Sequence, residues 1–216
     1  MDINAILNRV MRLARLDTTV FDEVRDDERE LIPAIVIVAI SSLLAGVGAW
    51  LWLLFVKPTG VDLDFGNVLL KIMLIGTIFA AVLWGVWVAI TYVILVQVYK
   101  EQTDLMSLMR TMGYAAFPFS LSLLMFIPGL SFGIALAAIV LWFVMSTYAV
   151  QAASNASSDR VIMANAIGFI VFAVFMALIA RESGLTTGVF VNAESRAISE
   201  GEYYKLDLGS LRDLLN

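Results

Sequence analysis

The feature that most constrains this fold is an uncharged stretch from Thr111 to Ser158, which runs for 48 residues without an Asp, Glu, Lys or Arg. A bilayer core about 30 Å thick needs roughly 20 apolar residues as α-helix, so the stretch is too long for one crossing and suits two. Pro128-Gly129 lies near its middle, where proline removes a helical hydrogen bond and glycine adds a flexible joint. The stretch therefore predicts a membrane hairpin, with one span before Pro128 and one after Gly129.

Three further apolar runs have the length of membrane spans. They are residues 31–56, residues 72–99 and residues 161–180. Small residues recur at four-residue intervals in these runs, a spacing typical of closely packed membrane helices. The pattern predicts an all-α fold, a polytopic integral membrane bundle with five transmembrane helices over residues 31–180.

Composition limits the chemistry that this chain can perform. Hydrophobic residues make up 61% of it and charged residues only 15%, whereas soluble domains carry about 25% charged residues. The chain has no Cys and no His, which removes disulfides, thiolate ligands and the usual general base near neutral pH. We therefore expect no cofactor and no metal site. The net charge of −5 argues against nucleic acid as a partner.

The middle of each predicted span carries no ionisable side chain. Ionisable groups at mid-membrane are the usual mark of proton relays, ion coupling and voltage sensing. Intramembrane proteases need a nucleophile with a base, or an aspartate pair, at membrane depth, and the serines of these spans have no such base. The sequence therefore predicts a protein that is not an enzyme and not an ion-coupled carrier.

A basic amphipathic helix is predicted close to the N-terminus. At about 100° per residue, Arg9, Arg12 and Arg15 lie on one side of this helix, and seven apolar side chains fall within an arc of about 160° on the other. These seven are Ile3, Ile6, Leu7, Val10, Met11, Leu13 and Ala14. Such a helix lies in the membrane interface and favours anionic lipids, or it packs on the protein's own cytoplasmic face; both can hold. The acidic segment that follows, Asp17 to Glu30, is either a solvated juxtamembrane face or a docking patch for a basic partner.

Five spans place the two termini on opposite sides of the membrane. With the N-terminus in the cytoplasm, eight Lys and Arg residues lie inside and six lie outside. Four of those six are in the C-terminal tail, where residues far from a span count little toward the positive-inside rule. The prediction is a multi-pass cell-membrane protein with cytoplasmic residues 1–30, a five-helix domain at 31–180 and an external polar tail at 181–216.

Three features, in this order, resemble the Yip (Ypt-interacting protein) domain family. They are the lead-in Thr18-Thr19-Val20-Phe21 through Pro33, the motif Gly113-Tyr114-Ala115-Ala116-Phe117-Pro118 after a polar connection, and Ile127-Pro128-Gly129 ahead of a fifth span led by Asp159-Arg160-Val161. The similarity covers about residues 6 to 180, and the chain resembles the prokaryotic kind because its N-terminal region is short.

The resemblance implies a five-span membrane protein with a cytoplasmic N-terminus and no catalytic residues. Eukaryotic members of the family act with Rab-type small GTPases in membrane trafficking, often as hetero-oligomers. What transfers to this chain is structural: Gly113 lets helices approach, Tyr114 supplies an interfacial hydroxyl and Pro118 bends the third span. Pro128 and Gly129 divide the hairpin.

Two functions fit these features. One is a membrane scaffold or adaptor that binds protein partners or self-associates, and that shapes the bilayer through its N-terminal helix. The alternative is a channel, transporter or lipid translocator, a conduit for a neutral or lipid-like substrate. Its polar cavity would be lined by Tyr92, Gln97, Tyr114, Tyr148, Gln151, Asn155 and Asn165. Hydrogen bonds between helices explain these polar residues equally well.

Overall fold

The structure, a computed structural model, describes residues 2–56, 70–127 and 129–183. Within these ranges every regular element is a helix, which confirms the all-α prediction. The predicted tail from residue 184 onward and Pro128 lie outside the described residues. The elements, in chain order, are α1 (Ile3–Ala14), α2 (Thr19–Arg25), η1 (Glu28–Glu30), α3 (Leu31–Val56), η2 (Leu70–Ile75), α5 (Gly76–Val93), η3 (Ile94–Val98), α6 (Leu105–Tyr114), η4 (Phe117–Phe126), α7 (Ser131–Ala153) and α8 (Ser158–Ser183).

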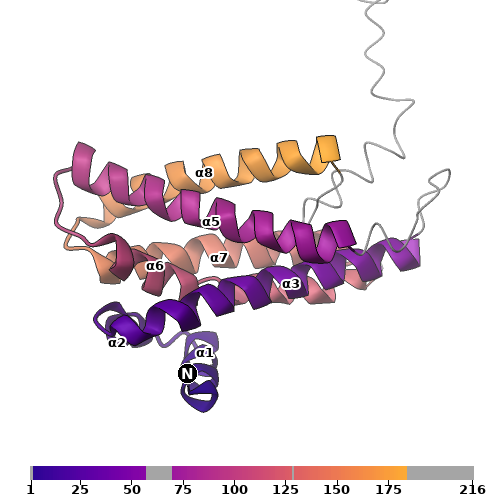
Figure 1. Cartoon of the computed structure of the whole chain (residues 1–216), viewed down its shortest axis with the longest axis horizontal. Helices are drawn as coiled ribbons and strands as arrows, with labels where there is room; N and C mark the ends of the chain where they lie inside the picture. The colour runs from indigo at the N-terminus through magenta and orange to yellow at the C-terminus, as the bar shows by residue number, and fades with distance from the viewer. Residues whose placement is uncertain (1, 57–69, 128, 184–216) are drawn as a thin grey trace, which may run out of the picture.

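Four helical stretches in the described part of the chain are long and apolar enough to cross a membrane: Glu28–Phe55, Met73–Val98, Ser131–Ala153 and Ser158–Leu178. The shortest has 21 residues, which reach about 31 Å at 1.5 Å per residue. They correspond to the predicted first, second, fourth and fifth spans. Figure 1 shows α3, α5, α7 and α8 extending along one common direction as a bundle.

The predicted third span is not one continuous helix. The α-helical part, α6, ends at Tyr114, and the chain continues from Phe117 as the 3-10 helix η4. The physical reason is Pro118, which has no N–H to donate and whose ring would collide with the carbonyl of Tyr114, four residues earlier. A 3-10 helix rises about 2 Å per residue, so the ten residues of η4 extend about 20 Å where an α-helix would extend about 15 Å.

The segment formed by α6 and η4 runs beside α3 in the same direction. A Cβ added to Gly113 would lie 2.9 Å from the carbonyl oxygen of Ala34, near the start of α3. A Cβ on Gly48, near the end of α3, would lie 2.8 Å from the Cα of Leu123 in η4. These glycines let the two backbones touch at both ends of the contact. Beyond η4 the chain turns at Gly129, whose φ of +81° suits glycine, and α7 packs back against η4.

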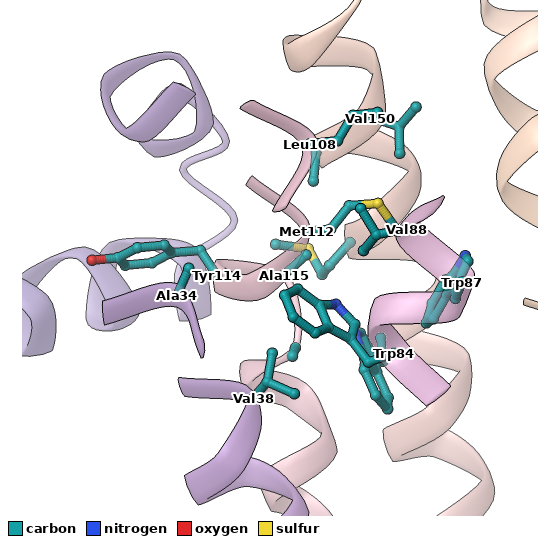
Figure 2. Packing of buried hydrophobic residues seen from close by; sticks show 14 of the residues in the cluster. Ala34, Val38, Trp84, Trp87, Val88, Leu108, Met112, Tyr114, Ala115 and Val150 are labelled. Carbon is teal, nitrogen blue, oxygen red and sulfur yellow. The ribbon is translucent and has the colours of Figure 1, made fainter. Parts of the chain in front are cut away.

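Aromatic rings fill the interior between α5, η4, α7 and α8. Trp142 lies 4.8 Å from Phe119 and 5.4 Å from Trp87, measured between ring centroids, and Phe169 and Phe172 of α8 complete the cluster. Aromatic pairs at these separations contribute about 0.5–1.5 kcal/mol each beyond the burial of their area. The rings continue into the hydrophobic cluster of Figure 2, where side chains of α3, α5 and α6 converge.

Candidate functional site

The most elaborate arrangement of polar side chains lies at the end of the bundle where α3 begins. Here α1, α2 and η1 fold against the long helices, and we call residues 3–30 the N-terminal cap. Glu30 is its central residue and is only 8% exposed. Its Oε1 lies 2.5 Å from Nη1 of Arg9 in α1, and its Oε2 accepts a hydrogen bond of 2.5 Å from the hydroxyl of Tyr114 in α6. Figure 2 shows the Tyr114 ring directed away from the other labelled residues of the hydrophobic cluster, past Ala34.

A second group of ion pairs connects α1 to α2. Arg12 lies 2.7 Å from Glu23 and 2.8 Å from Asp17, measured between guanidinium nitrogen and carboxylate oxygen. The hydroxyl of Thr19 donates to Asp17, and this hydrogen bond, together with that from Arg12, holds the pKa of Asp17 below its usual value. These groups are solvent-accessible, so each pair contributes little to stability. They orient α1 more than they stabilise it.

A buried arginine attaches α2 to α6. Arg110 is 6% exposed, and both its Nε and its Nη2 donate to the backbone carbonyl of Arg25, the last residue of α2. A cation at this position interacts favourably with the partial negative charge of a helix C-terminus. Ser107 of α6 donates to the same carbonyl at 3.3 Å. Hydrogen bonds from Arg110 and Ser107 to one backbone carbonyl therefore hold the C-terminal end of α2 against α6.

Apolar contacts hold the cap from within. Val20, Phe21 and Val24 of α2 and Leu13 of α1 are fully buried in the same cluster as the bundle core. Complete burial of one such side chain stabilises by about 1.5–3 kcal/mol, which is more than any of the exposed ion pairs. The cap is therefore a packed part of the domain.

The structure separates the three arginines of the predicted membrane-surface face. Arg9 and Arg12 direct their guanidinium groups to carboxylates of the cap. Arg15 is exposed and makes no ion pair within the described residues. The apolar face of α1 divides as well: Leu13 is buried, whereas Ile3, Leu7 and Met11 are each more than half exposed. The helix thus packs on the protein with one flank and leaves the other free.

The residues of the family motif take distinct positions. Gly113 lies against Ala34, Tyr114 binds Glu30, and Pro118 is the second residue of η4. Gly129 occupies the turn before α7, and its neighbour Pro128 lies outside the described residues.

Of the residues predicted to line a polar cavity, Asn165 lies fully buried among α5, α7 and α8, where its side chain makes hydrogen bonds only within the protein. Its Oδ1 accepts from the Trp87 indole N–H at 3.0 Å. Its Nδ2 donates to Ser146 Oγ and Thr147 Oγ1, both at 2.9 Å. The network joins α5, α7 and α8, and all donors and acceptors of the Asn165 side chain are used within the protein.

The other predicted cavity residues do not gather around Asn165. Tyr148 is 54% exposed on α7, and Gln97 and Asn155 are also exposed. Tyr92 is partly buried, and Gln151 donates from Nε2 to the carbonyl of Ala156 at 2.9 Å. Tyr114, as described above, lies in α6 and donates its hydroxyl hydrogen bond to Glu30 of the cap.

A shallow polar pocket lies beside the cap, where α7 ends. It is lined by Arg25, Asp26, Gln102, Ala152, Ala153, Ser154 and Asn155. Asn155 is the one predicted cavity residue that contributes to it. Arg25 closes one side by donating to the carbonyl of Ala152 at 3.0 Å. Among the described residues, no group of three carboxylates is placed to hold a metal ion.

Glu30 and Arg110 were not singled out from the sequence. Glu30 is the last charged residue before the 26 uncharged residues of the first span, and Arg110 is the last one before the 48-residue stretch. A charged residue directly beside a long apolar run lies at the edge of the membrane, where burying the charge without a partner is costly. This position in the sequence could have predicted that Glu30 and Arg110 each bind a partner.

Comparison with protein families gives one assignment. The Yip1 domain model matches residues 17–180, which is most of the chain and includes α2 and the four long apolar helices up to Ala180. The curated proteins and the solved structures contain no match. The matched range begins within the cap and ends near the end of α8. The chain therefore belongs to the Yip1 domain family of multi-span membrane proteins.

Proposed function

We propose that this protein is a membrane scaffold that binds protein partners at its N-terminal cap. Yip1 family proteins are non-enzymatic membrane proteins that act in membrane trafficking through partner binding. The observation that carries the proposal for this chain is the fixed attachment of the cap, through Glu30 to α1 and α6 and through Arg110 to α2. A scaffold needs a recognition surface held in one orientation relative to the membrane, and this attachment supports one.

The surface offered to a partner is acidic. Asp22 of α2 and Asp26, which follows it, expose 64% and 69% of their side chains, respectively, although both pair with Arg25. Glu23 directs one carboxylate oxygen to Arg12 but remains 42% exposed. Rim charges of this kind raise association rates and select partners by sign more than they add affinity. We therefore propose a basic partner surface.

The threading that we propose has five crossings, a cytoplasmic N-terminus and an external C-terminus in the cell membrane. The parallel course of α3 and the α6–η4 segment supports a crossing at residues 111–127 although no single helix spans it. Figure 1 shows α1 and the end of α8 at opposite ends of the bundle, which an odd number of crossings requires. The surplus of Lys and Arg near the membrane on the N-terminal side supports the orientation.

Photocrosslinking in native membranes tests the scaffold proposal. A photoreactive amino acid at Asp22 should give discrete protein adducts, and the same group at Ile170, which is 57% exposed on α8, should not give the same adducts. The Arg9→Glu variant breaks the pair with Glu30 and should reduce the Asp22 adducts severalfold. Arg29→Glu is the matched control, because Arg29 is exposed and unpaired within the described residues. Adducts that do not depend on Arg9 would contradict the proposal.

The conduit prediction has no comparable observation in its favour. The residues predicted to line the conduit lie apart from one another: Tyr148 is on the bundle surface, Tyr114 binds Glu30, and Asn165 is hydrogen-bonded within the bundle interior. An interior filled by Trp87, Trp142 and Phe172 supports packing rather than passage.

A further inference from the structure

The free flank of α1 is a line of exposed apolar side chains with no partner in the protein. Ile3, Leu7 and Met11 are spaced by four residues and are 62%, 54% and 54% exposed. Side chains at this spacing follow one stripe of a helix, here about 12 Å long. The opposite flank is occupied, because Leu13 is buried and Arg9 is paired with Glu30. The stripe is therefore available for a contact outside the chain.

The position of this stripe identifies what it meets. The ion pair between Arg9 and Glu30 holds α1 beside the start of the first apolar span. Ile32, two residues after Glu30, belongs to that span and exposes 67% of its side chain. The hydrocarbon of the bilayer thus begins within one helical turn of the residue to which α1 is bound. Figure 1 shows α1 outside the bundle and running across the direction of the long helices, the orientation of a helix lying in the plane of a membrane surface.

The C-terminal end of α1 also supports lipid as the contact of this helix. Asp17 N–H donates to the carbonyl of Arg12 and Leu16 N–H to that of Leu13, which is the hydrogen-bond pattern of a Schellman motif. Glycine is preferred at the position of Leu16, because the backbone there has a positive φ, here 64°. Leucine at this position is strained and also exposes 73% of its side chain to the surroundings. Contact with lipid would offset both costs.

The charges of α1 point to the headgroup chemistry. Arg9 and Arg12 are neutralised by Glu30, Glu23 and Asp17. Arg15 is exposed and lies about 40° around the helix from Met11, at the edge of the stripe. It can bind the phosphate of an anionic lipid while the stripe enters the acyl boundary.

We propose that α1 is an apolar wedge that inserts Ile3, Leu7 and Met11 into the leaflet on its own side of the bundle, with Arg15 binding an anionic headgroup. This inference rests on the proposed function only in placing the cap at the membrane surface. It assigns the lipid contact to the apolar stripe and to Arg15, and it leaves Arg9 and Arg12 to hold the helix on the protein.

The full-length protein offers a direct test because it has no native Cys. A single Cys at Leu7 or Met11 carries an environment-sensitive fluorophore, and the protein is reconstituted in phosphatidylcholine vesicles containing nitroxide-labelled lipid, with and without phosphatidylglycerol. The matched control is Asn8→Cys, which is exposed on the polar side of the same helix. We expect severalfold stronger quenching at positions 7 and 11 than at position 8. Phosphatidylglycerol should increase it, and Arg15→Gln should remove that increase.

Equal quenching at positions 7 and 8 would overturn the wedge. Disulfide-linked dimers formed by Leu7→Cys in place of lipid quenching would overturn it as well, because the stripe would then meet a second copy of the chain. Adducts at Asp22 are measured separately, so the scaffold proposal can fail while the wedge holds, and the reverse.

Discussion

The N-terminal cap and the bundle interior both contain buried polar side chains, but they satisfy them differently. In the cap and at its contact with α6, Glu30 and Arg110 are charged groups whose partners include Arg9 and a helix-terminal carbonyl. In the interior, Asn165 and Trp87 are neutral groups that bind each other and nearby hydroxyls. Neutral groups avoid the desolvation cost of an ion, so their hydrogen bonds are sufficient in the middle of the membrane.

This difference predicts where the protein tolerates change. The exposed ion pairs of the cap lie near water and can be rehydrated when they are broken, so their substitutions should cost little and act on the orientation of α1 and α2. The interior has no water to replace a lost partner, and its helices are in close contact, so its substitutions should act on the stability of the whole bundle.

The largest effect is expected from Gly168→Ala in α8. An added Cβ would lie 2.8 Å from both the Thr91 hydroxyl and the carbonyl oxygen of Trp87, so α8 has to move away from α5. That movement also lengthens the hydrogen bond between Trp87 and Asn165. We expect a loss of about 3 kcal/mol in unfolding free energy, at the upper end for overpacking, measured by denaturant titration in detergent micelles. Gly85→Ala is the control, because its Cβ would meet no atom within 4 Å, and equal losses for both variants would contradict the packing argument.

Asn165→Leu should come next, with a loss of about 2 kcal/mol. It removes three side-chain hydrogen bonds in a medium that offers no replacement. The indole N–H of Trp87 keeps only the longer bond of 3.2 Å to the Asn165 backbone carbonyl, and the two hydroxyls keep their bonds to the Phe143 carbonyl. The same titration measures it, and Asn155→Leu on the exposed turn after α7 is the matched control. A cost for Asn165→Leu no greater than that of the control would show that the network is energetically neutral.

The sequence was sufficient for the long helices and insufficient for the contacts between them. An uncharged run of 26 residues predicts its own helix, since length and hydropathy are local properties, and α3 has the predicted bounds of Leu31–Val56. Pro118 predicted a bend but not the ten-residue 3-10 helix in which it lies, because that conformation depends on packing against α3 and α7.

The charges show the same limit. The sequence predicted a basic face on the first helix, but it could not show that Arg9 reaches Glu30, 21 residues away, or that Tyr114 meets Glu30 across 84 residues. The helical arc grouped the arginines as one surface. Their separation into two paired residues and the exposed Arg15 depends on where the acidic segment folds, which is a tertiary property.

At the contact between α6 and the cap, Tyr114→Phe should weaken the attachment of the cap to the bundle by about 1 kcal/mol. This is less than is usual for a hydrogen bond to a charged group, because Glu30 keeps its ion pair with Arg9. Amide hydrogen exchange in α1 and α2 should accelerate about fivefold while exchange in α7 stays unchanged. Tyr148→Phe removes a hydroxyl from an exposed tyrosine and serves as the control. Acceleration in α7 as well would mean that the cap and the interior are one cooperative unit.

The smallest effect concerns pH and Asp17. Hydrogen bonds from Thr19 and Arg12 keep its pKa in the folded protein below the ordinary value of about 4. Its contribution to cap attachment is therefore fully present above that value and is lost as the pH falls through the lower folded pKa. Fluorescence anisotropy of a label at Asn8→Cys should decrease over this range as α1 becomes freer. Because Glu23 and Glu30 also pair with arginines of α1, the Asp17 contribution is the difference from Asp17→Asn. Superimposable profiles for the two proteins would show that Asp17 does not hold the helix.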